Sequence, residues 1–236
     1  MRYAETGFDL EVDLTRGNIE RVATDPELTD LYLGGLGTTA KIMWDRVPPE
    51  AEPFSPENLL MFSTGLLVGT PAIGCNRTIV ATFSPQTELL AFSMMGGFWA
   101  PELKYAGYDR VILRGKSPEL VYLWINNDKI ELRSAEHIWG KGTEESEELL
   151  IAETDPMAHI AAIGPAGENL VRLANVITGG VTGARAAGRG GVGAVMGSKN
   201  LKAVVARGTG GLKLADMAGF KQHVGRSDRG VCHGAS

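Results

Sequence analysis

Residues 185–203 read RAAGRGGVGAVMGSKNLKA, and this stretch carries the strongest local signal in the chain. It combines two arginines, a run of glycines and a closing basic pair, Lys199 and Lys202. Glycine leaves backbone N–H groups accessible and permits positive φ, so such a run can fold around a bulky anion. Arginine adds a planar fork of donors that matches phosphate oxygens. The stretch therefore predicts a cradle for a phosphate-bearing ligand.

Two other interpretations of this stretch remain open from the residues alone. Segment 188–193 satisfies the G-x-G-x-x-G pattern of dinucleotide-binding loops, but its flanks do not present an ordinary βαβ unit. No Gly-Lys-Ser/Thr closes a Walker A loop at the required spacing. The remaining interpretation is a glycine-rich turn between packed elements that holds no ligand.

The composition is that of an ordinary globular protein. The chain has 236 residues, of which 44% are hydrophobic and 22% charged, and its formal net charge is −5. This acidic balance argues against broad nucleic-acid binding, and no apolar stretch is long enough for a membrane span. The first residues, MRYAETGFDLEVDL, lack the apolar core of a signal peptide, so we expect a cytoplasmic protein. The two cysteines, Cys75 and Cys232, are too few for an iron–sulfur site of their own, and Cys75 is expected to be buried.

Short apolar runs separated by turn residues predict strands along most of the chain. Helices are expected at 36–44, at 101–106 and at 143–153, where Thr143 is the expected cap. Strands are expected at 8–14, 19–22, 59–62, 78–83, 89–94, 111–114, 121–125, 130–133, 160–163, 170–176, 192–196 and 203–206. Because strands dominate, the predicted class is α+β, built mainly on antiparallel sheet with a few short helices.

Several segments resemble the N-terminal domain of the aldehyde:ferredoxin oxidoreductase family, the tungsten enzymes that carry a bis-pyranopterin cofactor. They are LYLGGLGTTAKIMWDRVPPEAEPFSPENLLMFSTGLLVGTPA from Leu31, GGFWAPELKYAGYDRVILRGKSPELVYLWI from Gly96, HIWGKGTEESEE from His137, IGPAGENLVRLANV from Ile163, and the stretch from Arg185. Within the family, GCNRTIV from Gly74 and SPQTELLAFSMMGGFWAPELKYAGYD from Ser84 are most similar to the tungsten-bearing catalytic subunit of class II benzoyl-CoA reductases. The likeness covers residues 7–208, so we expect a domain at 1–209 and an unmatched, truncated or frame-shifted tail at 210–236.

The resemblance implies a fold and a ligand. In the family, two antiparallel sheets form a saddle under two pterins, whose dithiolenes hold tungsten and whose phosphates are bridged by Mg²⁺. By family position, the implied pterin contacts are Arg77, Met94, Met95, Gly96, Arg185, Ala186, Ala187 and Gly188. The implied magnesium contacts are the main-chain carbonyls of Met94 and Ala186.

The segment Met94-Met95-Gly96-Gly97 departs from the family's Asn-Ser-Gly-Gly. Methionine has no side-chain amide, so Met94 preserves the magnesium contact only if that contact uses the main-chain carbonyl. Met95 is flexible and polarizable, which suits a position on the substrate side. The alternative is that both methionines fill core space.

The resemblance implies a tungstopterin-binding domain of an oxidoreductase, of the dearomatising benzoyl-CoA reductase branch, with ferredoxin or another iron–sulfur subunit as electron partner. The family's C-x-x-C-x-x-x-C ligands for a [4Fe–4S] cluster are absent from this sequence, and no catalytic residue is assigned. Cluster-bearing domains on another chain, or a homo-oligomer, are therefore the expected partners. The alternatives are a non-catalytic remnant or binding module and, ranked last, a nucleotide-binding protein that uses the loop 188–193.

Overall fold

Two six-stranded sheets organise the chain. The structure is a computed structural model that describes the backbone of residues 3–233 and the side chains there, except those of residues 181–182 and 226–233. The first sheet runs, in spatial order, β2 (Asn18–Ala23), β1 (Phe8–Asp13), β6 (Arg110–Arg114), β3 (Leu60–Thr64), β4 (Thr78–Phe83) and β5 (Leu90–Met95). The second runs β11 (Arg185–Ala187), β10 (Val176–Thr178), β9 (His159–Ala162), β12 (Leu201–Arg207), β7 (Val121–Asn126) and β8 (Lys129–Ser134).

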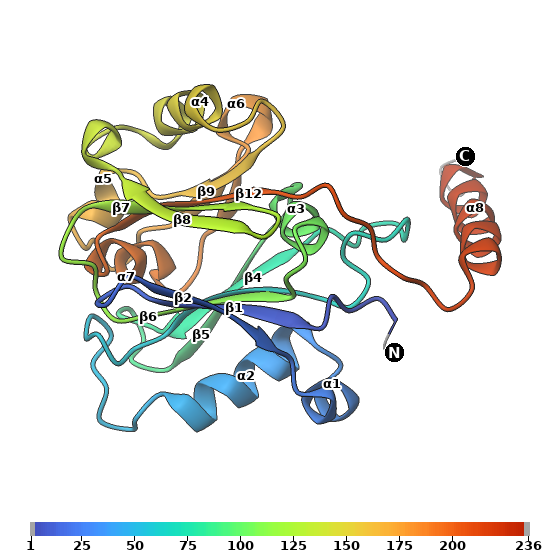
Figure 1. Cartoon of the computed structure of the whole chain (residues 1–236), viewed down its shortest axis with the longest axis horizontal. Helices are drawn as coiled ribbons and strands as arrows, with labels where there is room; N and C mark the ends of the chain where they lie inside the picture. The colour runs from blue at the N-terminus through green and yellow to red at the C-terminus, as the bar shows by residue number, and fades with distance from the viewer. Residues whose placement is uncertain (1–2, 234–236) are drawn as a thin grey trace.

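Helices cover the outer faces of the sheets and fill the space between them (Figure 1). They are α1 (Pro26–Tyr32), α2 (Gly35–Arg46), α3 (Trp99–Tyr105), the 3₁₀ turn η1 (Glu136–Ile138), α4 (Thr143–Glu153), α5 (Pro165–Glu168), α6 (Gly180–Gly183) and α7 (Val192–Ser198). The last helix, α8 (Met217–His233), stands apart from both sheets. α2 covers the first sheet and α4 the second, while α3 and α7 lie between the sheets. The order of layers is therefore helix, sheet, wedged helices, sheet, helix.

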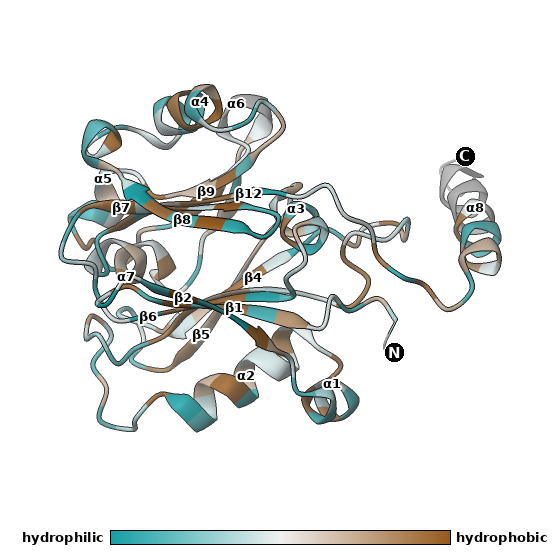
Figure 2. Cartoon of the chain, viewed as in Figure 1, coloured by the Kyte–Doolittle hydropathy of each residue, from teal (hydrophilic) through white to brown (hydrophobic). Residues whose placement is uncertain are grey.

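The main core lies between the two sheets, where the apolar strand residues gather (Figure 2). Phe62 of the first sheet packs against Trp99 of α3, with ring centroids 5.2 Å apart. The Trp99 indole N–H donates to the carbonyl of Val204 in the second sheet at 2.8 Å, so its polar atom is satisfied inside the core. α3 thus joins the two sheets through one buried aromatic side chain.

The predicted α+β class is confirmed, and the sheets are mixed rather than antiparallel throughout. β1 pairs in parallel with β6, and β7 pairs in parallel with β12. Parallel strands are joined by long crossover connections, whereas turn residues in the sequence indicate only hairpins between antiparallel strands. The parallel pairs were therefore not predicted. The hairpin predicted at 121–133 is present as β7 and β8, and the strand predicted at 78–83 is β4.

The strand predicted at 192–196 is wrong, because these residues form α7. Every residue of α7 is buried, so the helix shows no polar stripe from which a helical period could be read. The strand predicted at 170–176 is also wrong over most of its length. Leu170 has a φ of +56° and Leu173 is exposed, and strand β10 begins only at Val176. Helix α4 begins at Thr143 itself, and its N-cap is Gly142.

Among the described residues, no helix has both the length and the apolar character needed to cross a membrane.

Candidate functional site

The three predicted cofactor-binding segments lie together where an edge of one sheet meets an edge of the other. Met94 and Met95 end β5, the outer strand of the first sheet, and Arg185 begins β11, the outer strand of the second. Arg77 directly precedes Thr78, which pairs with Met95 across the β4–β5 ladder. Residues that are more than one hundred positions apart in the sequence therefore share one junction, which we call the edge junction.

Arg185 and Gly96 make the contact that joins the two segments. A Cβ placed on Gly96 would lie 3.9 Å from both Cγ and Cδ of Arg185. The Arg185 guanidinium donates from one nitrogen, Nη1, to the carbonyls of Gly183 at 2.7 Å and Ala184 at 3.1 Å. These two hydrogen bonds hold the Nη1 side of the guanidinium against the backbone just before Arg185. The side chain therefore crosses Gly96 in a defined orientation.

The edge junction carries exposed positive charge. Arg77, Arg185 and Arg189 are all exposed. Within the described part of the chain, none of the three forms an ion pair with a carboxylate, whereas Arg46, Arg110 and Arg114 elsewhere all do. Arginines without a protein counter-ion, beside exposed backbone at Gly188, suit an anionic ligand with several oxygen acceptors.

The two methionines divide between the surface and the core. Alternation along β5 leaves the Met94 residue 50% exposed and buries Met95 to 1% exposure in the core between the sheets. The core-packing alternative therefore applies to Met95 and not to Met94. Because the Met95 side chain is buried, Met95 can contribute only its backbone to the edge junction. Met94 can contribute both its side chain and its backbone.

The remaining β11 residues and Gly188 extend the junction along the second sheet. Ala186 pairs with Ile177 of β10, and Ala186 and Gly188 are exposed whereas Ala187 is buried. Arg189, which the sequence prediction left out of the site, follows directly and is exposed. Its position beside Gly188 in the same arginine- and glycine-rich stretch was the available signal.

Most glycines after Gly188 serve close packing rather than ligand binding. A Cβ on Gly190 would lie 2.6 Å from Cβ of Ala91, and one on Gly191 would lie 2.1 Å from the carbonyl oxygen of Arg172. Both glycines have positive φ, and the start of α7 that follows them is buried. The packed-turn interpretation therefore describes 190–197, and the loop 188–193 presents no open helix N-terminus to a nucleotide.

The basic pair that closes the stretch does not face the edge junction. Lys199 is buried, and its Nζ donates to the carbonyls of Asn58 at 2.6 Å and Gly115 at 3.0 Å. Burial lowers the pKa of Lys199 to about 8, because desolvation disfavours its charged form. Lys202 is also buried and forms an ion pair with Glu168. Both lysines hold loops in place, so neither is available to a ligand at the edge junction.

Two serine hydroxyls of the β4–β5 hairpin fasten the glycine-rich loop to the first sheet. Ser93 Oγ accepts the backbone N–H of Arg189 at 2.9 Å, and Ser84 Oγ donates to the carbonyl of Gly190 at 2.9 Å. Sequence reasoning missed both, since a lone serine in a strand gives no signal of a partner about one hundred residues away. We call Ser84, Ser93, Arg189 and Gly190 the serine clasp.

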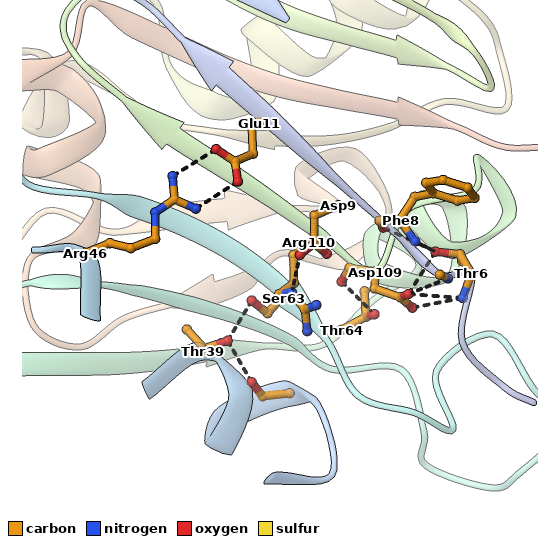
Figure 3. Close-up of polar contacts among 12 residues, drawn as sticks. Thr6, Phe8, Asp9, Glu11, Thr39, Arg46, Ser63, Thr64, Asp109 and Arg110 are labelled. Carbon is orange, nitrogen blue, oxygen red and sulfur yellow. Dashed lines mark hydrogen bonds and ion pairs between the residues drawn. The ribbon is translucent and has the colours of Figure 1, made fainter. Parts of the chain in front are cut away.

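A second polar cluster lies away from the edge junction, at β1 and β6 (Figure 3). Arg110 Nε donates to Asp9 at 2.9 Å, and buried Lys104 pairs with Asp109 at 2.7 Å. The other carboxylate oxygen of Asp9 has no hydrogen-bond partner among the described residues. Burial raises the pKa of Asp9 to about 6, although Arg110 opposes the shift. The cluster joins strands and the segment before β1, so we assign it to the fold.

Neither cysteine gives evidence of a metal site. Cys75 is half-buried, against the expectation of a buried thiol, and the side chain of Cys232 lies outside the described residues. Among the residues that the structure describes, no group of three or more His, Cys, Asp or Glu is arranged to hold a metal ion.

Comparison with known proteins identifies relatives over nearly the whole chain. The protein-family model for the aldehyde ferredoxin oxidoreductase N-terminal domain matches residues 9–208. The chain is 45% identical over 217 residues to a tungsten-containing aldehyde ferredoxin oxidoreductase of Pyrococcus abyssi and 42% identical over 219 residues to that of Pyrococcus furiosus. Each match covers 92% of this chain, but only 35% and 36%, respectively, of the relative.

A solved structure is similar over the whole fold. It is the active site complex BamBC of benzoyl coenzyme A reductase in complex with 1,5-dienoyl-CoA, and one of its chains is 64% identical to this one with a TM-score of 0.95. The likeness covers 99% of this chain and 35% of that chain. This chain thus spans about one third of the length of its relatives. The family model matches residues 9–208, two curated relatives are more than 40% identical, and the fold of a solved relative is closely similar. The chain therefore belongs to the aldehyde ferredoxin oxidoreductase family and corresponds to the N-terminal domain of its members.

Proposed function

We propose that this chain is the tungstopterin-binding part of an oxidoreductase of the benzoyl-CoA reductase branch. The observation that carries the proposal is the edge junction, where Arg77, Arg185 and Arg189 are exposed near Gly96 and Gly188 and have no carboxylate partner among the described side chains. The names of the relatives support tungsten as the metal of the cofactor. The 64% identity to a benzoyl coenzyme A reductase chain supports the assignment to the benzoyl-CoA reductase branch.

The chemistry of the junction fits the pterin phosphates. Each guanidinium can offer parallel N–H donors to phosphate oxygens, and charge-assisted bonds of this kind are stronger than neutral ones. Arg185 would bind one phosphate with the nitrogens that Gly183 and Ala184 leave free, and Arg77, which directly precedes β4, would supply a second guanidinium. The main-chain carbonyls of Met94 and Ala186 are the proposed contacts for a phosphate-bridging Mg²⁺, an ion that prefers oxygen ligands. Ala187 and Met95 would contribute backbone groups only.

When bound, a tungsten bis-pyranopterin supplies the electron-transfer chemistry, and the polypeptide supplies binding, orientation and electrostatics. The arginines would offset the phosphate charge, and the close contact at Gly96 would keep the Arg185 side chain against the sheet edge. The substrate class proposed from the solved relative is a benzoyl-type acyl-CoA. No residue described here is assigned to a proton transfer.

The electron partner is proposed to be ferredoxin or another iron–sulfur subunit. The sequence contains two cysteines, which cannot supply four ligands to a [4Fe–4S] cluster. We therefore propose that cluster-bearing domains outside these 236 residues, or a homo-oligomer, complete the assembly, in the cytoplasm. We propose that the chain divides into a domain at 1–209 and a distinct tail at 210–236.

The test is metal and pterin analysis of the chain produced anaerobically in a tungstate-fed host that makes the cofactor. We expect tungsten and two pterins per chain in the parent protein and strong loss in Arg77→Ala and Arg185→Ala. Arg16→Ala is the matched control, because Arg16 is an exposed arginine on the distant β1–β2 turn. A folded parent chain with neither tungsten nor pterin would overturn the proposal and favour a non-catalytic remnant.

A further inference from the structure

The two halves of the edge junction belong to different sheets, and hydrogen bonds from side chains hold them together. β5 and β11 are the outer strands of their respective sheets, and neither is a ladder partner of the other. The relative position of Gly96 and Arg185 is therefore not fixed by backbone pairing. The serine clasp connects the two halves at this point through the hydrogen bonds of Ser93 and Ser84 to the loop at Arg189 and Gly190.

Ser93 is the member of the clasp nearest to the proposed ligand. It lies one residue before Met94, its side chain is buried, and its Oγ accepts the N–H of Arg189 at 2.9 Å. Arg189 in turn directly follows Gly188. One hydroxyl thus ties the strand that carries the first binding segment to the loop that carries the second.

Ser84 performs a different task in the same clasp. Its Oγ donates to the Gly190 carbonyl at 2.9 Å and also accepts the N–H groups of Gln86 and Thr87, each at 3.1 Å. It therefore shapes the β4–β5 turn as well as holding the loop. Removing Ser84 disturbs local folding, whereas removing Ser93 breaks a single hydrogen bond across the junction.

We propose that Ser93 is a positioning residue, which holds Gly188 and Arg189 against β5 so that the arginines on both sheet edges reach the same anionic group. This inference rests on the proposed function, because it concerns the same ligand. Ser93 does not contact the ligand in this scheme. It acts through the backbone of Arg189, and the loss of its hydroxyl frees that backbone to move.

The test compares Ser93→Ala and Ser93→Thr with the parent chain in two measurements. The first is amide hydrogen exchange of residues 185–191 in the chain without cofactor. The second is the tungsten and pterin content of chain produced in the tungstate-fed host. Ser146→Ala is the matched control, because Ser146 is a fully buried serine in α4 whose hydroxyl has no partner among the described residues.

We expect Ser93→Ala to speed exchange at the Arg189 amide and to lower cofactor content about fivefold, the effect of one lost hydrogen bond. Ser93→Thr keeps a hydroxyl and is expected to restore both values, and the thermal midpoint of each variant shows that the fold is kept. Ser146→Ala is expected to match the parent in both measurements.

The outcomes separate this inference from the proposed function. A parent chain that loads cofactor while Ser93→Ala loads equally well overturns the positioning role and leaves the proposed function standing. Unchanged exchange at Arg189 in Ser93→Ala also overturns it. A parent chain that acquires no cofactor overturns the proposed function, and the positioning role with it.

Discussion

The side chain of Arg185 crosses Gly96 with its Cγ and Cδ 3.9 Å from the point where a Cβ would stand. That distance is ordinary van der Waals contact, so the glycine is not required by space alone. Nor does its backbone require glycine, because Gly96 does not have a positive φ, whereas its neighbour Gly97 has a φ of +95°. Of these two adjacent glycines, only Gly97 is required by its backbone conformation.

Gly96→Ala is expected to leave stability within about 0.5 kcal/mol of the parent, because the added methyl finds room beside Arg185. Gly97→Ala is expected to lose about 1–3 kcal/mol, because an alanine is strained at that φ. Urea unfolding of both variants measures the difference. Equal stability of the two variants would contradict the assignment.

Gly96→Glu is expected to fold and to reduce cofactor content roughly tenfold, because a carboxylate beside Arg185 would compete for its donors. Tungsten and pterin analysis of purified chain gives the measurement. Gly96→Gln is the matched control, since it adds similar volume without charge and is expected to lose less. If Gln and Glu had the same effect, the cause would be steric and the electrostatic argument would fail.

Gly193→Ala and Gly197→Ala are expected to destabilise the protein by about 1–3 kcal/mol or more, through overpacking. Added Cβ atoms would lie 2.4 Å from the Asn175 carbonyl oxygen and 2.0 Å from that of Gly167. Helix propensity alone predicts the opposite sign, a gain of about 1 kcal/mol per site in α7. Thermal unfolding decides between them, with Gly211→Ala, whose Cβ would meet open space, as the neutral control.

Asp9 is expected to make a pH-dependent contribution to folding. Its pKa is raised to about 6 by burial, so the folded state binds the proton more tightly than the unfolded state. The sign follows: this contribution favours folding at low pH and is lost as pH rises from about 4 to about 6, by up to about 3 kcal/mol.

The measurement is the difference in unfolding free energy between the parent and Asp9→Asn across that pH range. Taking the difference removes the carboxylates common to both proteins. We expect the parent to lose stability relative to Asp9→Asn as pH rises. A flat difference would show that Arg110 cancels the effect of burial on Asp9, and a difference that rises with pH would show that Arg110 outweighs it.

Lys202→Met is expected to destabilise the protein by about 3–5 kcal/mol, because it leaves the buried Glu168 carboxylate without its counter-ion. The double variant Lys202→Met with Glu168→Gln is expected to recover part of the loss. Lys41→Met, which breaks an exposed helical pair with Asp45, is expected to cost no more than about 0.5 kcal/mol. Chemical unfolding of the parent and these three variants gives the comparison, and equal losses at Lys41 and Lys202 would refute the role of burial.

Local patterning was sufficient to predict elements whose signals lie within a few residues. The run TIVATF at 78–83 is β-branched and apolar and forms β4. Of the predicted turn Asn126-Asn127-Asp128, the last two residues connect β7 to β8, and Asn126 ends β7. The resemblance to a family added the three segments that meet at the edge junction. Their approach could be expected from the family but not from spacing in the sequence.

Helix α7 shows why other elements could not be predicted. Val192 and Val195 favour strands, and two glycines weaken a helix, so local preference points away from the observed structure. Gly193 and Gly197 are four positions apart and let the helix lie against the backbone at Asn175 and Gly167. Close packing therefore outweighs intrinsic preference here, because a larger residue could not approach so near.

The sequence by itself determined the α+β class, most strand positions, the family and the concentration of arginine and glycine that indicates an anionic ligand. Only the tertiary structure decided which basic residues are available to that ligand. Lys199 and Lys202 sit in the same stretch as Arg185, yet their partners, the Asn58 carbonyl and the Glu168 carboxylate, are distant in sequence and draw them into the interior. The reason is physical: a buried cation must be paired or hydrogen-bonded, and the groups that satisfy it are brought near only when both sheets are assembled.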